Sequence, residues 1–248
     1  MSQLHRVCPS ATMRDRWESF VQEYSTADIC VAVLPEIPAD LPPAVASLRR
    51  LNPLPSFVVV THLDASHMLP FRRVCVDEFF NVDEIGPSLG SQLDRTFLAT
   101  LRERLVQSFS GVAQEGDAVR QALAAAIGEP SAFRSVQALS RQVGVTTRTL
   151  EKQWHRRPAN SLRLEDALWI VRLLYALELR QEGATVSDIA ARLRTDVRSL
   201  QKASQRHLMS SLGSVSPESL AAHAAKLALL LSMYANNHFP EAGFGNAP

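Results

Sequence analysis

The chain has 248 residues and a mass of 27.4 kDa, enough for two domains of ordinary size. Its 46% hydrophobic and 21% charged residues exclude collagen-like, disulfide-scaffold and wholly disordered chains. The net charge of +1 is unevenly spread: residues 1–115 carry 10 Lys and Arg against 14 Asp and Glu, and residues 116–248 carry 16 against 11. Residues 130–213, with 14 basic against 7 acidic side chains, have the local charge that a polyanion-binding surface needs.

The cysteines and the N-terminus indicate a reduced, cytoplasmic protein. Cys8, Cys30 and Cys75 are odd in number and have no metal-ligand spacing, so we expect buried free thiols. The first residues lack the apolar core of a signal peptide, and the longest apolar run is interrupted at Ser232. We therefore expect no membrane span, no metal and no cofactor.

Residues 1–115 alternate short apolar runs with helical patterns, as a chain of β-α-β units does. The predicted strands are 29–34, 57–60 and 74–80, and the predicted helices are 13–24, 44–51 and 92–109. Continuous apolar runs are typical of strands buried on both faces of a parallel sheet. Six of the 14 prolines fall in 35–55, which predicts a loop with at most a short helix there.

From residue 116 onward the patterns are helical. An Ala-rich helix over 118–127 lies between glycines, so 116–130 is expected to be a helical connector after an α/β domain at 1–115. Residues 131–216 are expected to form an all-helical domain, and 217–248 a C-terminal helix and tail. The stripe of leucines in the helix 217–234 is expected either to pack on its own domain or to form a subunit interface.

Residues 135–154 have the pattern of a helix-turn-helix. Gly144 supplies a positive-φ turn, Thr146 an N-cap, and Leu150 and Trp154 an inward face for the second helix. Side chains of this kind on an exposed helix suit base edges and phosphates in a major groove. The predicted DNA contacts from this unit are Thr146, Thr147, Arg148, Glu151, Lys152, His155 and Arg156.

A second copy follows at a constant offset of 50 residues, over 186–202. Arg198 and Lys202 match Arg148 and Lys152, and Ser199 lies between them, so these three complete the predicted DNA contacts. A long helix over 162–181 joins the two units. This arrangement would present two recognition helices roughly one DNA turn, about 34 Å, apart.

Residues 131–215 resemble the DNA-binding domain of AraC/XylS-type transcriptional regulators, two helix-turn-helix units bridged by a linker helix. The residues that carry the resemblance are Leu139, Ser140, Val143, Gly144, Thr146, Leu150, Trp154, Arg172, Leu173, Ala176, Leu179, Ile189 and Ala190. Arg194, Thr195 and Ser204 depart from the pattern, replacing a turn glycine and two aromatic or apolar side chains, and the second turn is one residue short of it. The second unit is therefore expected to attract phosphates more than to select a sequence.

The first half resembles a truncated response-regulator receiver domain, which has a flavodoxin-like parallel sheet. Three segments carry the resemblance: 27–33, 55–61 and 76–81. Val33 stands where the resemblance implies a phosphoacceptor aspartate, and the lysine of the last strand is missing. We therefore expect that this domain has no residue that could accept a phosphoryl group.

Together these features predict a DNA-binding transcriptional regulator that reads duplex DNA through its first unit and has a phosphorylation-independent N-terminal interaction module. We expect no enzymatic activity. A homodimer or another protein partner is expected through the N-terminal domain or the C-terminal helix. The alternative is a protein-interaction adaptor whose helical domain keeps the fold but has lost selective DNA binding.

Overall fold

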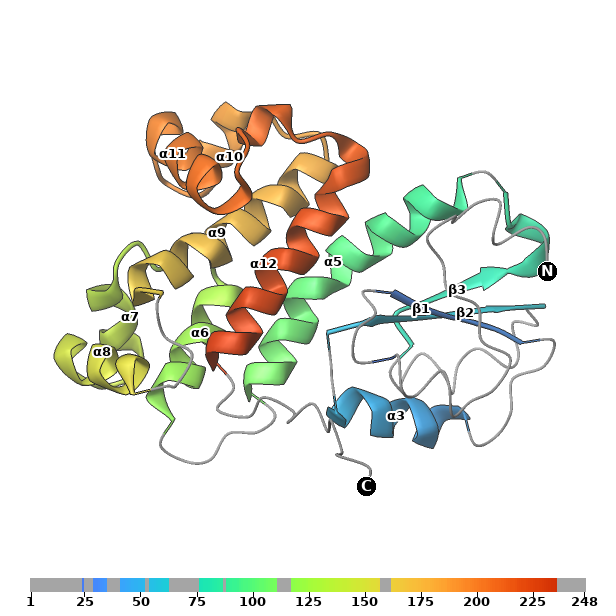
Figure 1. The fold of residues 1–248 in the computed structure, drawn as a ribbon, viewed down its shortest axis with the longest axis horizontal. Coiled ribbons are helices and arrows are strands. Elements are labelled where there is room, and N and C mark those ends of the chain that lie inside the picture. The colour runs from blue at the N-terminus through green and yellow to red at the C-terminus, as the bar shows by residue number, and fades with distance from the viewer. Residues whose placement is uncertain are drawn as a thin grey trace, which may run out of the picture. The chain divides into compact units, whose positions relative to one another are not determined.

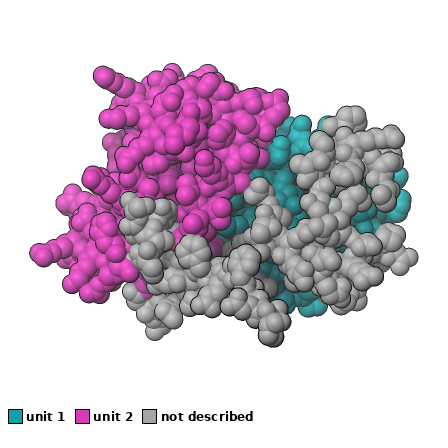
Figure 2. All heavy atoms as spheres, viewed as in Figure 1, with its two compact units in different colours: residues 1–104 teal, residues 105–248 magenta. Residues whose placement is uncertain are grey.

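A computed structural model describes residues 24, 29–34, 41–51, 54–62, 76–86, 88–110, 117–156 and 162–235. The chain divides into two compact units, residues 1–104 and residues 105–248 (Figure 2). The first contains a small parallel sheet with helices, and the second is helical in every segment described. The expected α/β and helical parts are thus both present. The boundary expected at residue 115 lies outside the described residues.

Three parallel strands form the sheet of the first unit, in the order β1 (Ile29–Val33), β2 (Ser56–Thr61) and β3 (Glu78–Asn81) (Figure 1). Cys30 pairs with Phe57 between β1 and β2, and Val59 pairs with Phe79 between β2 and β3. All six residues of β2 are buried, as expected for the central strand of a covered parallel sheet. The third strand begins at Glu78, later than predicted, and residues 74 and 75 lie outside the described residues.

Each face of this sheet is covered by apolar side chains. The core on one face joins Cys30, Phe57 and Val59 of the strands to Val45 and Leu48 of α3 (Leu41–Leu51). On the other face, Val58 packs with Leu89 and Leu93 of α5 (Leu89–Ser110). The predicted strands at 29–34 and 57–60 and the helix at 92–109 are therefore confirmed, with shifted ends.

The proline-rich stretch is more ordered than predicted. Instead of a short helix within a loop, α3 has 11 residues and begins at Leu41, ahead of Pro42 and Pro43. Both prolines fall in the first turn, where backbone N–H groups have no partner within the helix and proline is tolerated. The predicted helix at 13–24 lies outside the described residues except for Tyr24.

The described helices of the second unit follow the prediction closely. Their bounds are α6 (Ala118–Gly128), α7 (Val136–Gln142), α8 (Thr147–His155), α9 (Leu164–Gln181), α10 (Val186–Arg192), α11 (Val197–Leu208) and α12 (Leu220–Ala235). Twelve of the 18 residues of α9 are buried, and α9 contacts α6, α7, α10, α11 and α12. It is therefore the central helix of this unit (Figure 1).

The C-terminal helix packs on its own unit. It contacts α9 and α6, and the apolar stripe of α12 is buried, including Leu220, Ala224, Leu227 and Leu231. Of the two roles foreseen for this stripe, self-packing is the one observed. Among the described residues, every helix is either too short or too polar for a membrane span.

Candidate nucleic-acid interface

The first helix pair, α7 and α8, is closed by the turn that the sequence predicted. Gly144 has φ +71° in this turn, and its N–H donates to the carbonyl of Arg141. Thr146 caps α8, because its Oγ1 accepts from the N–H of Thr149 at 3.1 Å. Such a cap satisfies a backbone donor that the helix itself leaves without a partner.

The second helix pair, α10 and α11, repeats this backbone 50 residues later. Three turn hydrogen bonds of the first pair run from Val143 N–H to Leu139 O (3.2 Å), Gly144 N–H to Arg141 O (3.2 Å) and Val145 N–H to Ser140 O (3.0 Å). Their counterparts run from Leu193 N–H to Ile189 O, Arg194 N–H to Ala191 O and Thr195 N–H to Ala190 O, each 2.9 Å. The second turn is therefore as long as the first.

At the matched positions of the two pairs, different side chains form the turn and the N-cap. Arg194 takes the place of the turn glycine and adopts φ +50°, a left-handed conformation that is costly for a residue with a Cβ. Asp196 replaces the threonine cap, accepting from Ser199 N–H at 2.7 Å, and hydrogen bonds from Ser199 hold the pKa of the Asp196 carboxyl below its usual value. A charged acceptor at a helix N-terminus also interacts favourably with the helix dipole.

Exposed cations occur at the same positions on α8 and α11. Arg148 and Lys152 on α8 and Arg156 at its C-cap recur every four residues, and Arg198, Lys202 and Arg206 recur likewise on α11. Within residues 117–156 and 162–235, Arg206 alone of these six forms an ion pair. The other five are free to attract a polyanion.

The remaining predicted contacts divide into two groups. Glu151 and His155 are exposed on α8 beside the cations. Thr147 and Ser199 are only half-exposed, and the Thr147 hydroxyl lies 3.1 Å from that of the buried Ser140 on α7. This hydrogen bond joins the two helices of the first pair. At the matched positions the second pair has Ala190 and Val197, which have no hydroxyl groups.

Three exposed residues at the second pair were absent from the predicted contacts. Arg194 lies in the turn, and Gln201 and Arg206 lie on α11. Gln201 and Arg206 match Glu151 and Arg156 at the offset of 50, so extending that offset to the end of the helix would have found both. Because Gln201 stands where α8 has Glu151, the exposed side of α11 carries three cations and no acid.

Each recognition-type helix is tied to the backbone that follows it by a buried side chain. Trp154, fully buried on α8, donates its indole N–H to Leu162 O at 2.8 Å. Ser204, also fully buried at the matched position on α11, donates its hydroxyl to Ser210 O at 2.6 Å. The packing role expected for Trp154 is confirmed. A small hydroxyl forms the corresponding link in the second pair.

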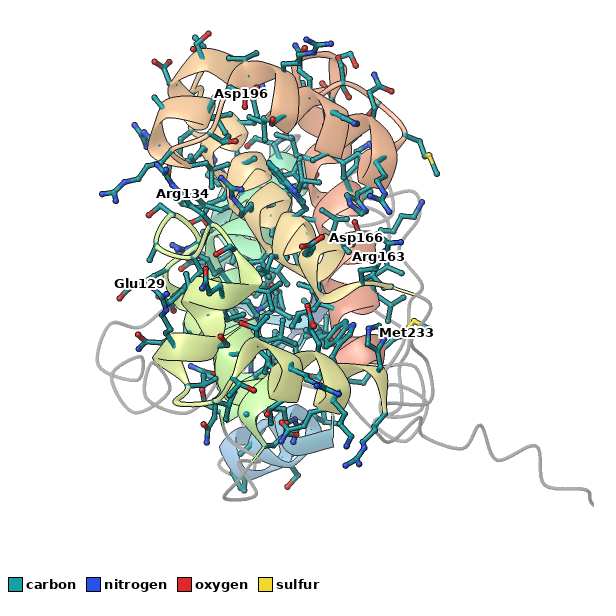
Figure 3. The ribbon with its side chains drawn as sticks, turned by 90° about the vertical axis from the view of Figure 1, so that its left-hand side faces the viewer. Glu129, Arg134, Arg163, Asp166, Asp196 and Met233 are labelled. Carbon is teal, nitrogen blue, oxygen red and sulfur yellow. The ribbon has the colours of Figure 1, made fainter. Side chains whose placement is uncertain are left out.

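The central helix α9 holds the second pair through polar side chains as well as apolar ones. Arg172 stacks 4.4 Å from the ring of Trp169 and donates to Leu193 O at 2.8 Å. Burial lowers the pKa of Arg172, and nearby Arg134 acts in the same direction. Near the start of α9, Asp166 pairs with Arg206 of α11. Figure 3 labels Asp166 and Arg163 near the start of this helix.

The two helix pairs lie on either side of α9, with α7 and α8 below it and α10 and α11 above it in Figure 1. Both are toward the left-hand edge of Figure 1, and both are in view in Figure 3, where Asp196 marks the turn of the second pair. The 18-residue α9 that joins them in the sequence is about 27 Å long at 1.5 Å per residue. No family model, curated protein or solved structure matches the chain.

Proposed function

We propose that this protein is a DNA-binding transcriptional regulator whose two helix pairs are helix-turn-helix units bridged by α9, as in AraC/XylS-type regulators. In this proposal α8 and α11 enter successive major grooves. The first helix pair, α7 and α8, reads base edges through Arg148, Glu151 and Lys152, while Arg156 and the cations of α11 hold phosphates.

One observation carries the proposal: the same turn occurs twice at an offset of 50 residues, followed each time by exposed cations at the same helix positions. The repeated turn requires only packing. The repeated cations add nothing to that packing, because five of the six form no ion pair with a described residue. A positively charged surface that occurs at two sites of the same backbone fits a duplex.

The sheet-containing unit, residues 1–104, supports a regulatory module without phosphorylation chemistry. Its strand order β1-β2-β3, all parallel, is that of the last three strands of a receiver-like sheet. Val33, at the carboxyl end of β1, is 51% exposed and offers no carboxylate. We expect small phosphodonors with Mg²⁺ to leave the mass of the intact protein unchanged. A phosphoryl adduct within residues 1–104 would overturn this part of the proposal.

The test of DNA binding is a selection from a randomised duplex library, followed by a salt titration on the selected duplex and a scrambled one. The four cations assigned to phosphates, Arg156, Arg198, Lys202 and Arg206, predict that log K falls with log salt with a slope of about −4. The variant Arg148→Ala/Lys152→Ala should enrich no sequence. The control is Lys226→Ala, an exposed cation on α12 outside both pairs. Binding that ignores salt, or no binding at all, would favour the adaptor alternative.

A further inference from the structure

We infer that Arg206 is a phosphate-binding residue of the second helix pair and that the buried Asp166 of α9 is the residue that orients it. The inference rests on the proposed function, and it assigns to α11 a pre-oriented contact that α8 lacks. The structural basis is a bidentate ion pair between the buried carboxylate of Asp166 and the exposed guanidinium of Arg206.

The geometry of this pair is well defined. Arg206 Nη1 lies 2.9 Å from Asp166 Oδ1, and Arg206 Nη2 donates to Asp166 Oδ2 at 3.0 Å. The carboxylate is only 8% exposed, whereas the Arg206 side chain is 64% exposed. One side of the planar guanidinium therefore faces the buried acid, and further N–H groups remain for a second acceptor.

The position of Arg206 points to the kind of acceptor. It completes the row begun by Arg198 and Lys202 on the side of α11 that carries no acid. A guanidinium already fixed in one orientation loses little side-chain freedom when it binds, and its planar fork suits phosphate oxygens. The matched residue of the first pair, Arg156, is exposed and has no ion pair with a described residue.

A competing role for the same pair is purely structural, in which Asp166 and Arg206 only fasten α11 to α9. His207, whose Nε2 is 3.9 Å from Asp166 Oδ1, is part of the same contact. The two roles predict opposite signs for one substitution. Asp166→Asn removes a negative charge, which by simple electrostatics strengthens DNA binding; loss of the orienting carboxylate weakens it.

The experiment measures duplex binding of the full chain by fluorescence anisotropy on a scrambled duplex, at several salt concentrations and at a temperature where circular dichroism shows every variant folded. Arg206→Ala should bind roughly five- to tenfold more weakly, with a salt slope shallower by about 0.9. Asp166→Asn should bind about threefold more weakly, because the guanidinium keeps its charge but loses its orientation. The matched control is Glu165→Gln, the same charge change on the exposed neighbouring residue.

Two results would overturn the inference. One is Asp166→Asn binding as tightly as Glu165→Gln or more tightly. The other is Arg206→Lys binding as the wild type does, since charge without the fork would then suffice. Arg206→Lys also keeps the test decisive if Arg206→Ala fails to fold. A wild type that binds no duplex would instead refute the proposed function, whereas dependence on Arg148 with no effect at Arg206 would refute this inference alone.

Discussion

Trp154 fills the interior at the end of α8, and 50 residues later Ser204 occupies the matched position at the end of α11. The turns before these helices have the same backbone hydrogen bonds. A large apolar anchor has been exchanged for a small polar one without a change in the motif's backbone. The comparison teaches that helix spacing and turn geometry specify this motif, while the side chain that ties the second helix to the backbone after it can vary.

The largest expected difference between the pairs is in folding stability. Trp154→Ala should lower the free energy of unfolding by about 3–5 kcal/mol, because it leaves a large cavity and an unpartnered carbonyl at Leu162. Ser204→Ala removes one buried hydrogen bond and should cost about 1 kcal/mol. Denaturant unfolding monitored by circular dichroism measures both. Equal losses would mean that the two anchors do equivalent work despite their sizes.

The next difference concerns DNA. Arg148→Ala and Lys152→Ala should each weaken binding to a selected duplex by about 1–3 kcal/mol and relax its sequence preference. Arg198→Ala and Lys202→Ala should weaken binding to selected and scrambled duplexes alike, with shallower salt slopes. Titrations of both duplexes separate these patterns, and Lys226→Ala serves as the control. If Arg198→Ala weakened binding only to duplexes that contain one half-site, the second helix pair would also select a sequence.

A smaller effect should distinguish the two turns. Gly144→Ala places a Cβ at φ +71° and should cost about 1 kcal/mol through the backbone alone, since no heavy atom beyond the two adjacent residues lies within 4 Å of the new methyl group. Arg194→Gly relieves a comparable conformation and should be neutral or stabilise by up to about 1 kcal/mol. Thermal melting of the two variants makes the comparison. A clear loss on Arg194→Gly would show that this side chain contributes contacts that outweigh its backbone cost.

The smallest expected effect is a pH dependence confined to the second pair. Burial lowers the pKa of His207, with Asp166 opposing and Arg206 reinforcing the shift. The unfolded chain therefore takes up a proton near pH 6.5 that the folded chain takes up only at lower pH, so stability falls as the pH drops from about 7.5 to 5. His207→Gln should flatten this dependence in denaturant unfolding. A slope unchanged by His207→Gln would locate the titration elsewhere.

Much of this architecture follows from periodicity. The parallel strands, the helix pairs and the caps at Thr146 and Asp196 all depend on residues close in sequence, whose spacing and chemistry are visible without a structure. The helix α3 is longer than the short helix predicted there, because a proline breaks a helix only beyond its first turn. First-turn prolines such as Pro42 lose no helical hydrogen bond.

The pairing of Asp166 with Arg206 could not be predicted in the same way. These residues are 40 positions apart, and their contact depends on how α11 packs against α9. The partial burial of Thr147 has a similar origin, since it follows from the crossing of α7 and α8 at Ser140. Local pattern therefore located the candidate interface, whereas the tertiary packing determined which side chains remain free to use it.

The buried thiol of Cys30 can report on transient opening of the sheet in residues 1–104. Burial raises the pKa of this thiol to about 12, so almost none of the reactive thiolate is present at neutral pH while the sheet is intact. In a chain with Cys8→Ser and Cys75→Ser, the rate at which a thiol reagent labels Cys30 therefore follows the transient opening of the sheet. That rate yields an opening free energy for the α/β unit alone, independent of any unfolding of the helical unit.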